Sequence, residues 1–317
     1  MSDQTNIIIL CPGQGAQQVG MGKAWAERYP VAADTFARAD EVLGIELSKT
    51  CFEGPDDTLN RTDFAQAALY TCAVASFRGL CEEGAIDPAN IVATAGLSLG
   101  EFTALHLAGA FDFETGLKLV RLRGQAMQDA AESVPSSMVA LIRGDEEKAT
   151  ALCAAALEGH ADEVLVPANF NAPGQVVISG SAAACERAAT KAEEFEMVAK
   201  PLTVAGAFHS PIMQPAADRL AAALDEATWN TPNMPVVSNV TAEPHDNNDI
   251  ESIKKRLVEQ LTSPVRWADS MVWTINNIQG QFIEMAPNKV LGGLMKRVDR
   301  KTKVANNDQP PAVPAGS

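Results

Sequence analysis

Gly96-Leu-Ser-Leu-Gly100 places a serine between two glycines, a spacing that can present a nucleophile. The glycines allow a strand to turn sharply into a helix, so that the hydroxyl of Ser98 would be exposed at the corner. The backbone N–H of Leu99 would then face an oxyanion that develops beside Ser98, helped by the N-terminus of the helix. The five-residue pattern is common by chance, but a strand expected before it and a helix expected after it favour a nucleophile.

A serine hydroxyl needs a base, and histidine often supplies it. The sequence contains four histidines: His106, His160, His209 and His245. His106 falls within the helix expected after the serine and is expected to pack there, whereas His160 and His245 lie in polar, loop-like segments. His209 lies in a loop of small residues, Ala205-Gly-Ala-Phe-His-Ser210, and elimination favours it as the base.

Strands that alternate with helices are expected to position these residues. Asn6–Leu10 and Ile91–Ala95 are short apolar runs, each followed by a glycine turn. Helical patterns cover residues 22–43, 62–79 and 101–110. After residue 206 the alternation resumes, with strands expected at 235–240 and 281–285 and a helix at 250–261. This order predicts a parallel sheet covered by helices.

The middle of the chain has a different pattern. Strands are expected at 137–143, 163–171, 175–180 and 197–204, and helices at 145–157, with Asp145 as N-cap, and at 181–196. The order βαββαβ is that of a ferredoxin-like unit. The predicted fold class is α/β, with a hydrolase-like parallel-sheet domain formed by residues 1–131 and 207–305 and an inserted ferredoxin-like small domain at 132–206. The polar, Pro-rich residues 306–317 are expected to form a disordered tail.

Composition excludes several classes of protein. The 317 residues are 46% hydrophobic, which is enough for a sizeable core and argues against disorder. The net charge of −15 lacks the basic footprint of a nucleic-acid-binding protein. No apolar run reaches the ~18 residues of a membrane span, and the first residues lack the basic start of a signal peptide. We therefore expect a cytoplasmic protein that binds neither nucleic acid nor membrane.

Neither a metal nor a cofactor is expected. The Gly13-Gln-Gly15 turn lacks both the Gly-Lys-Ser/Thr ending and the Gly-x-Gly-x-x-Gly spacing of nucleotide-binding loops. The six cysteines contain no Cys-x-x-Cys pair, so we expect buried thiols in place of zinc ligands or disulfides. These cysteines are Cys11, Cys51, Cys72, Cys81, Cys153 and Cys185.

Several separated motifs, spread over residues 6–305, carry a family resemblance. With the Gly96-Leu-Ser-Leu-Gly-Glu-Phe102 motif they resemble the malonyl-CoA:acyl-carrier-protein transacylases of dissociated fatty-acid synthesis. The other motifs are Pro12-Gly-Gln-Gly-Ala-Gln17, Arg123-Gly-Gln-Ala-Met127, Asn169-Phe-Asn-Ala-Pro-Gly-Gln-Val-Val-Ile178, Phe208-His-Ser-Pro-Ile-Met213, Val237-Ser-Asn-Val240 and Gln260-Leu-Thr-Ser-Pro-Val-Arg-Trp267.

The resemblance implies a role for each matched residue. Ser98 would carry the acyl group as an ester, and His209 would be general base and then general acid. The backbone carbonyl of Gln260 would orient His209 in place of an aspartate, which makes a catalytic dyad. The backbone N–H groups of Gln14 and Leu99 would form the oxyanion hole.

The resemblance also implies how malonyl is selected. Arg123 would bind the free carboxylate of malonyl through two parallel hydrogen bonds, which a lysine would not reproduce. Phe208 would narrow the pocket against a branched α-carbon, and Gln66 matches a glutamine that lines the pocket. Coenzyme A is a substrate in this reaction, so no cofactor is required.

Two positions depart from the family pattern. Leu97 stands before the nucleophile, where the family usually has histidine, and we expect it to pack beneath the turn and to change pocket shape or rate more than chemistry. Ala286-Pro-Asn-Lys-Val-Leu291 replaces Gly-Pro-Gly-Lys-Val-Leu, which predicts a different turn.

The partner implied by the resemblance is acyl carrier protein, bound transiently, and the resemblance leads us to expect a monomer. Because carrier proteins of such systems are acidic, an enzyme with a net charge of −15 needs local basic residues for docking. The candidates are Lys118, Arg121, the Lys254-Lys255-Arg256 cluster and Lys296-Arg297.

Two other functions stay open. A serine esterase or thioesterase would use the same turn with water as acceptor, but it would ordinarily want an acidic third residue and has no use for Arg123. A non-catalytic scaffold that binds carrier protein has Leu97 as its only support. Within the transferase reading, the sequence does not decide between fatty-acid and polyketide synthesis.

Overall fold

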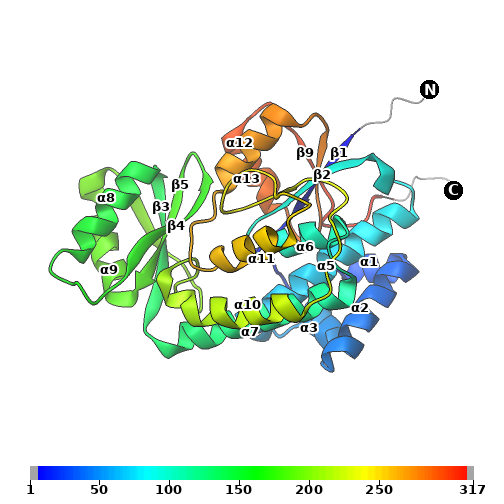
Figure 1. The fold of residues 1–317 in the computed structure, drawn as a ribbon, viewed down its shortest axis with the longest axis horizontal. Coiled ribbons are helices and arrows are strands. Elements are labelled where there is room, and N and C mark those ends of the chain that lie inside the picture. The colour runs from blue at the N-terminus through cyan, green and yellow to red at the C-terminus, as the bar shows by residue number, and fades with distance from the viewer. Residues whose placement is uncertain (1–5, 313–317) are drawn as a thin grey trace.

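The computed structural model describes residues 6–312 and contains two separate sheets. Figure 1 shows the larger α/β part on one side and the smaller part, built around β3, β4, β5, α8 and α9, on the other. The larger sheet is parallel and has the strand order β7-β2-β1-β8-β9. Its strands are β1 (Ile7–Cys11), β2 (Ile91–Gly96), β7 (Val236–Val237), β8 (Gln281–Glu284) and β9 (Val304–Asn306).

Helices cover both faces of this sheet, and its central strand β1 is accordingly apolar throughout. Along β1, alternate side chains enter two different cores: Ile7, Ile9 and Cys11 one, Ile8 and Leu10 the other. The helices of this domain are α1 (Lys23–Arg28), α2 (Pro30–Leu43), α3 (Leu47–Glu53), α4 (Asp56–Asn60), α5 (Thr62–Glu82), α6 (Gly100–Leu107), α7 (Phe113–Ser133), α10 (Gln214–Glu226), α11 (Ile250–Glu259), α12 (Trp267–Asn277) and α13 (Val290–Val298).

The smaller sheet is antiparallel, with the order β4-β5-β3-β6. Its elements follow the predicted βαββαβ order, and the Asp145 carboxylate caps the first helix by accepting from Lys148 N at 2.8 Å. The fold class predicted from sequence is therefore confirmed. The elements are β3 (Ser136–Gly144), α8 (Glu146–Leu157), β4 (Leu165–Ala172), β5 (Gly174–Ser181), α9 (Ala182–Lys191) and β6 (Val198–Pro201).

Two long helices connect these parts. The chain enters the small sheet from α7 and begins α10 soon after leaving it, and these two helices lie side by side (Figure 1). The loop that carries His209 precedes α10, and Arg123 lies on α7. The insertion thus brings two of the predicted site residues to the same region.

Two sequence predictions need correction. The helix predicted at residues 22–43 is two helices, because Tyr29 is extended and Pro30 begins α2. Residues 306–312 of the predicted disordered tail pack on the body: the carboxylate of Asp308 accepts from Asn288 N at 2.6 Å, and its carbonyl accepts from Trp25 Nε1 at 3.3 Å. Residues 313–317 lie outside the described part.

None of the helices within residues 6–312 combines the length and the apolar character that a membrane crossing requires.

Candidate active site

Ser98 lies at the turn between β2 and α6, as predicted. Its φ of 52° is in the left-handed region, which costs a non-glycine residue about 1–2 kcal/mol. Both flanking residues must be glycine because neither position has room for a Cβ. A Cβ at Gly96 would lie 1.9 Å from the carbonyl atoms of Gly100, and one at Gly100 would lie 2.1 Å from Cys11 O. The turn is therefore a strained corner that holds its serine at the carboxyl end of β2.

The side chain of His209 meets this serine. Ser98 Oγ lies 2.8 Å from His209 Nε2, and His209 Nδ1 lies 2.7 Å from the backbone carbonyl of Gln260. Because a carbonyl only accepts, Nδ1 carries the proton and Nε2 is left to accept one from the serine. Burial, helped by the positive charge of Arg123, lowers the pKa of His209 to about 4, so the imidazole is neutral at pH 7.

Arg123 lies beneath the serine, fully buried on α7. Nη1 donates to Gln66 Oε1 at 2.7 Å, and Nη2 donates to Ser98 Oγ at 3.1 Å and to Gln260 Oε1 at 2.8 Å. Burial lowers the pKa of Arg123 to about 10, while Glu101 opposes the shift, so the guanidinium stays charged at pH 7. Within residues 6–312, Nε has no hydrogen-bond partner.

A cavity of about 850 Å³ opens over Ser98 and His209, between the larger α/β domain and the small domain. Ser98 and His209 are on its wall, together with Phe208 and Gln14, and the small domain contributes Asn169 and others. Gln66 and Arg123 are buried below the wall, at 0% and 1% exposure, and Gln66 also contacts Met127 Sδ at 3.3 Å.

The two predicted oxyanion donors belong to neighbouring turns. Leu99 is the N-cap residue of α6, and Gln14 lies in the turn after β1 that lines the same cavity. A Cβ at Gly13 would lie 2.2 Å from Leu97 O, so a glycine allows the two turns to approach. Among the described residues, neither the Gln14 nor the Leu99 backbone N–H donates a hydrogen bond.

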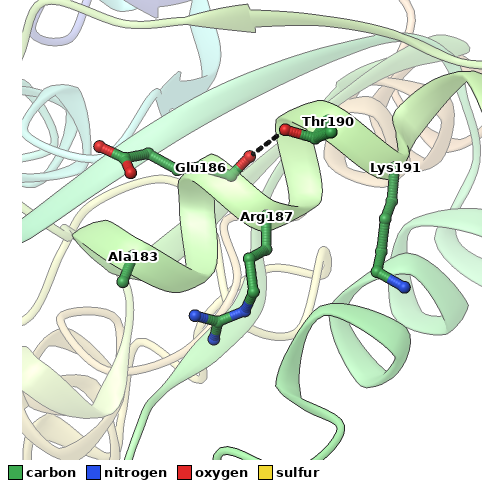
Figure 2. A pocket seen from close by; sticks show the side chains of 5 residues that line it. All are labelled: Ala183, Glu186, Arg187, Thr190 and Lys191. Atoms are coloured by element: carbon green, nitrogen blue, oxygen red, sulfur yellow. Dashed lines mark hydrogen bonds between the residues drawn. The ribbon is translucent and has the colours of Figure 1, made fainter.

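A second hollow, of about 380 Å³, lies along α9 of the small domain. Figure 2 shows its lining side chains, all from one helix. Its arginine, Arg187, already donates to Ala156 O at 2.8 Å and pairs with Glu163. This surface has no group poised for chemistry. In the part of the chain that the structure describes, no three His, Cys, Asp or Glu side chains are grouped as metal ligands.

Comparison with known proteins identifies the family. The model of the acyl transferase domain matches residues 8–313. The malonyl CoA-acyl carrier protein transacylase of Escherichia coli K12 is 41% identical over 307 residues, 96% of each chain. The chain belongs to the acyl transferase family, among the malonyl-CoA:acyl-carrier-protein transacylases.

Solved structures agree with this placement. An acyl carrier protein S-malonyltransferase from Vibrio cholerae superposes with a TM-score of 0.88 at 41% identity, covering 96% of this chain and 98% of that one. A malonyl-transacylase in complex with a type II polyketide acyl carrier protein gives 0.90 at 37% identity, covering 96% and 97%.

The structure shows the surroundings of both departures from the transacylase motifs. Leu97, expected beneath the turn, is half-buried and lines the cavity with Val290, Leu291 and Leu294. Asn288, at the position of a family glycine, has φ 67°, which asparagine tolerates better than most residues. The turn thus contains a left-handed residue without a glycine at that position.

Sequence reasoning missed three residues behind the serine. Asn239 and Glu101 belong to two of the family motifs but have no role predicted from them, and His245 is expected in a polar loop. His245 is buried, and its Nε2 lies 2.7 Å from Glu101 Oε1. No local pattern signals this pair, since its members lie 144 positions apart. His106, expected to pack, does so, with Nδ1 3.0 Å from Phe111 O.

Proposed function

We propose that this transacylase transfers malonyl from malonyl-CoA to the phosphopantetheine thiol of acyl carrier protein through an ester on Ser98. The observation that carries the proposal is the position of Arg123. Nε and Nη2 lie on one edge of the planar guanidinium, and Nη2 lies 3.1 Å from the Ser98 hydroxyl. A carboxylate attached to an acyl group on Ser98 would meet a buried cation there.

In the first half-reaction, Ser98 Oγ attacks the thioester carbonyl while its proton passes to His209 Nε2. The N–H groups of Gln14 and Leu99 stabilise the oxyanion. When the carbon–sulfur bond breaks, the imidazolium returns the proton to the coenzyme A thiolate. The second half-reaction runs in reverse: the carrier-protein thiol gives its proton to His209, its sulfur attacks the ester, and Ser98 recovers its hydroxyl.

Arg123 makes the reaction selective for malonyl. A buried guanidinium without an ionic partner is costly, and in residues 6–312 its acceptors are neutral oxygens. A malonyl carboxylate supplies the missing negative charge through charge-assisted hydrogen bonds, which an acetyl group does not. Phe208, on the cavity wall, would limit branching at the α-carbon.

The carrier protein would dock beside α13. Val290, Leu291 and Leu294 of this helix line the cavity, and Lys296 and Arg297 on its last turn are exposed. Two of the other candidates are already engaged: Arg121 pairs with Asp63, and Lys254 with Asp225 and Glu251. Lys255 and Arg256 lie on α11, which contributes no residue to the cavity wall, and Lys118 lies nine positions before Met127, the first residue of α7 on that wall. Lys296-Arg297 is therefore the basic pair that we assign to the acidic carrier.

Intact mass after brief mixing with malonyl-CoA or acetyl-CoA, without carrier protein, tests the proposal on the wild type and on Ser98→Ala. We expect a malonyl adduct on the wild type alone. Coenzyme A release without an adduct would point to a hydrolase that uses water as acceptor. The absence of both adduct and coenzyme A release would overturn the transferase and favour a scaffold.

The docking assignment has its own test. Lys296→Glu with Arg297→Glu should raise KM for carrier protein and leave acylation by malonyl-CoA unchanged. The matched control is Lys118→Glu on α7, an exposed lysine whose helix lines a different part of the site. Equal KM values in all variants would discard the pair.

A further inference from the structure

A buried carboxylate–histidine pair lies behind the nucleophile, outside the cavity and unused by the mechanism above. Glu101, on the first turn of α6, is 1% exposed, and the side chain of His245 is fully buried. His245 Nε2 lies 2.7 Å from Glu101 Oε1. Within residues 6–312, His245 Nδ1 has no hydrogen-bond partner. The proton of the imidazole therefore lies on Nε2, which donates a hydrogen bond to Glu101.

The second oxygen of Glu101 accepts two more hydrogen bonds. Asn239 N donates at 3.1 Å, and Gln260 Nε2 donates at 2.6 Å. A buried carboxylate is tolerated only when its oxygens are satisfied in this way. Glu101 therefore fixes a loop residue and a residue at the end of α11, two segments that meet only in the folded chain.

These two residues in turn hold the peptide groups around Ser98. Its N–H donates to Asn239 Oδ1 at 2.6 Å, and Asn239 Nδ2 donates to Gly96 O at 2.7 Å. Gln260 Nε2 also donates to Ser98 O at 3.1 Å. The left-handed conformation of Ser98 is thus held on both sides by the side chains of two residues that Glu101 binds, Asn239 through its backbone N–H and Gln260 through its side-chain amide.

The same network reaches the other half of the dyad. The Gln260 backbone carbonyl accepts from His209 Nδ1 at 2.7 Å, and its side-chain oxygen accepts from Arg123 Nη2 at 2.8 Å. One glutamine therefore contacts the serine, the histidine and the arginine. Its own orientation is set by the bond to Glu101.

The loop between Asn239 and His245 is folded so that both ends reach Glu101. Ser238 N donates to Glu243 O at 2.9 Å, His245 N donates to Val236 O at 2.9 Å, and Val237 bridges Pro244 in antiparallel register. This turn brings residue 245 back beside β7, next to the residue that touches the serine.

We infer that Glu101 and His245 are positioning residues that hold Ser98 and Gln260 in the geometry acyl transfer requires. The inference rests on the proposed function, because its measure is the rate of Ser98 acylation. Small displacements of reacting groups lower rates by about 10²-fold even when the altered residue is remote from the chemistry. Substrate binding in the cavity, which neither residue lines, should be left intact.

The test compares Glu101→Ala with Glu101→Gln and His245→Ala with His245→Gln. Glutamine at 245 keeps a donor near the position of Nε2, and glutamine at 101 keeps the oxygen that Asn239 and Gln260 use. We expect the rate of acylation by malonyl-CoA to fall about 10²-fold in the alanine variants and to recover within about 5-fold in the glutamine variants. KM for malonyl-CoA should stay within about 3-fold.

His106→Gln is the matched control. It removes the half-buried histidine of α6, which contacts Phe111 and not the network. It should lower Tm and leave the acylation rate unchanged. An equal loss of rate in His106→Gln at an equal loss of Tm would overturn the inference, as would alanine variants that acylate at the wild-type rate.

Two further measurements keep the test decisive. If the alanine variants do not fold, His245→Asn replaces them: its amide matches Nδ1 in reach and falls short of Glu101, so it should acylate more slowly than His245→Gln, and equal rates would refute the inference. Labelling of Ser98 by phenylmethanesulfonyl fluoride should follow the same order of variants. Because this reagent needs no malonyl recognition, a failure of malonyl-CoA to acylate the wild type would count against the proposed function alone.

Discussion

The cavity floor and the core of the small domain are both buried, but they are built from opposite materials. Residues 136–201 bury apolar side chains, with Asn169 and Ser179 as the buried polar exceptions. Around and behind Ser98, by contrast, the chain buries an arginine, a glutamate, two histidines and several amides, which we call the cavity floor. These residues are Gln66, Glu101, Arg123, His209, Asn239, His245 and Gln260.

The difference separates stability from function. Apolar burial in the small domain stabilises the fold wherever volume is conserved, so many sequences would serve. Burying the charged and polar groups of the cavity floor costs desolvation free energy. Each carboxylate, amide and guanidinium there forms hydrogen bonds that position a residue of the site. The strained backbone of Ser98 is likewise unfavourable for stability, and such strain persists only where surrounding contacts determine the conformation.

The largest effect should come from Ser98 itself. Ser98→Ala and Ser98→Gly both remove the proposed nucleophile, so neither should form an acyl-enzyme by intact mass. Their stabilities should differ: only glycine adopts φ 52° without strain, so Ser98→Gly should be more stable than Ser98→Ala by about 1 kcal/mol in urea unfolding. Equal stabilities would show that the turn stores no backbone strain.

His209→Ala should be the next most damaging change. General base catalysis contributes roughly 10²–10⁴-fold, and acylation by malonyl-CoA should fall by that factor in rapid-quench kinetics. Rates within 10-fold of the wild type would assign the base elsewhere. Because His209 lines the cavity, its removal enlarges that cavity and leaves no new void in a hydrophobic core, so Tm should change little by comparison.

Arg123→Ala should lower malonyl transfer by about 10- to 10²-fold, the effect of one or two hydrogen bonds to a charged group. Acetyl transfer should be kept or increased, because a neutral acyl group no longer meets a buried cation. Competition between malonyl-CoA and acetyl-CoA measures the ratio directly. An equal loss of both substrates would make Arg123 a structural residue.

Lowering the pH should change the ionisable groups of the cavity floor before it disturbs the apolar core of the small domain. With the pKa of His209 at about 4, the proposed base is neutral and able to accept a proton above that pH, and protonated below it. The rate constant kcat/KM for acylation should therefore be flat from pH 7 to about 5 and fall about 10-fold per unit below 4. A midpoint near 6.5, the ordinary value for histidine, would mean that water reaches the dyad.

The smallest effect on activity should come from the small-domain core. Leu152, fully buried on α8, packs in that core. Leu152→Ala should reduce the free energy of unfolding by about 2–5 kcal/mol, while acylation per folded molecule stays within about 2-fold. A rate loss comparable to that of Arg123→Ala would show that the two regions are coupled.

Much of the fold and part of the site were available from the sequence. Alternating strands and helices predicted the parallel sheet, and the βαββαβ order predicted the small domain, because both patterns are local. The Gly-x-Ser-x-Gly spacing predicted the turn for a steric reason that the structure bears out at Gly96 and Gly100. The choice of His209 followed from the small number of histidines.

Other features were decided by tertiary structure alone. The sequence did not indicate that residues 306–308 pack against the loop of Asn288, because a Pro-rich polar segment has no pattern of its own. It did not reveal the Glu101–His245 pair, nor that Gln260 joins the serine, the histidine and the arginine. A hydrogen bond depends on a few ångströms between atoms, and over 100 positions of sequence that distance is set by the packing of the whole sheet.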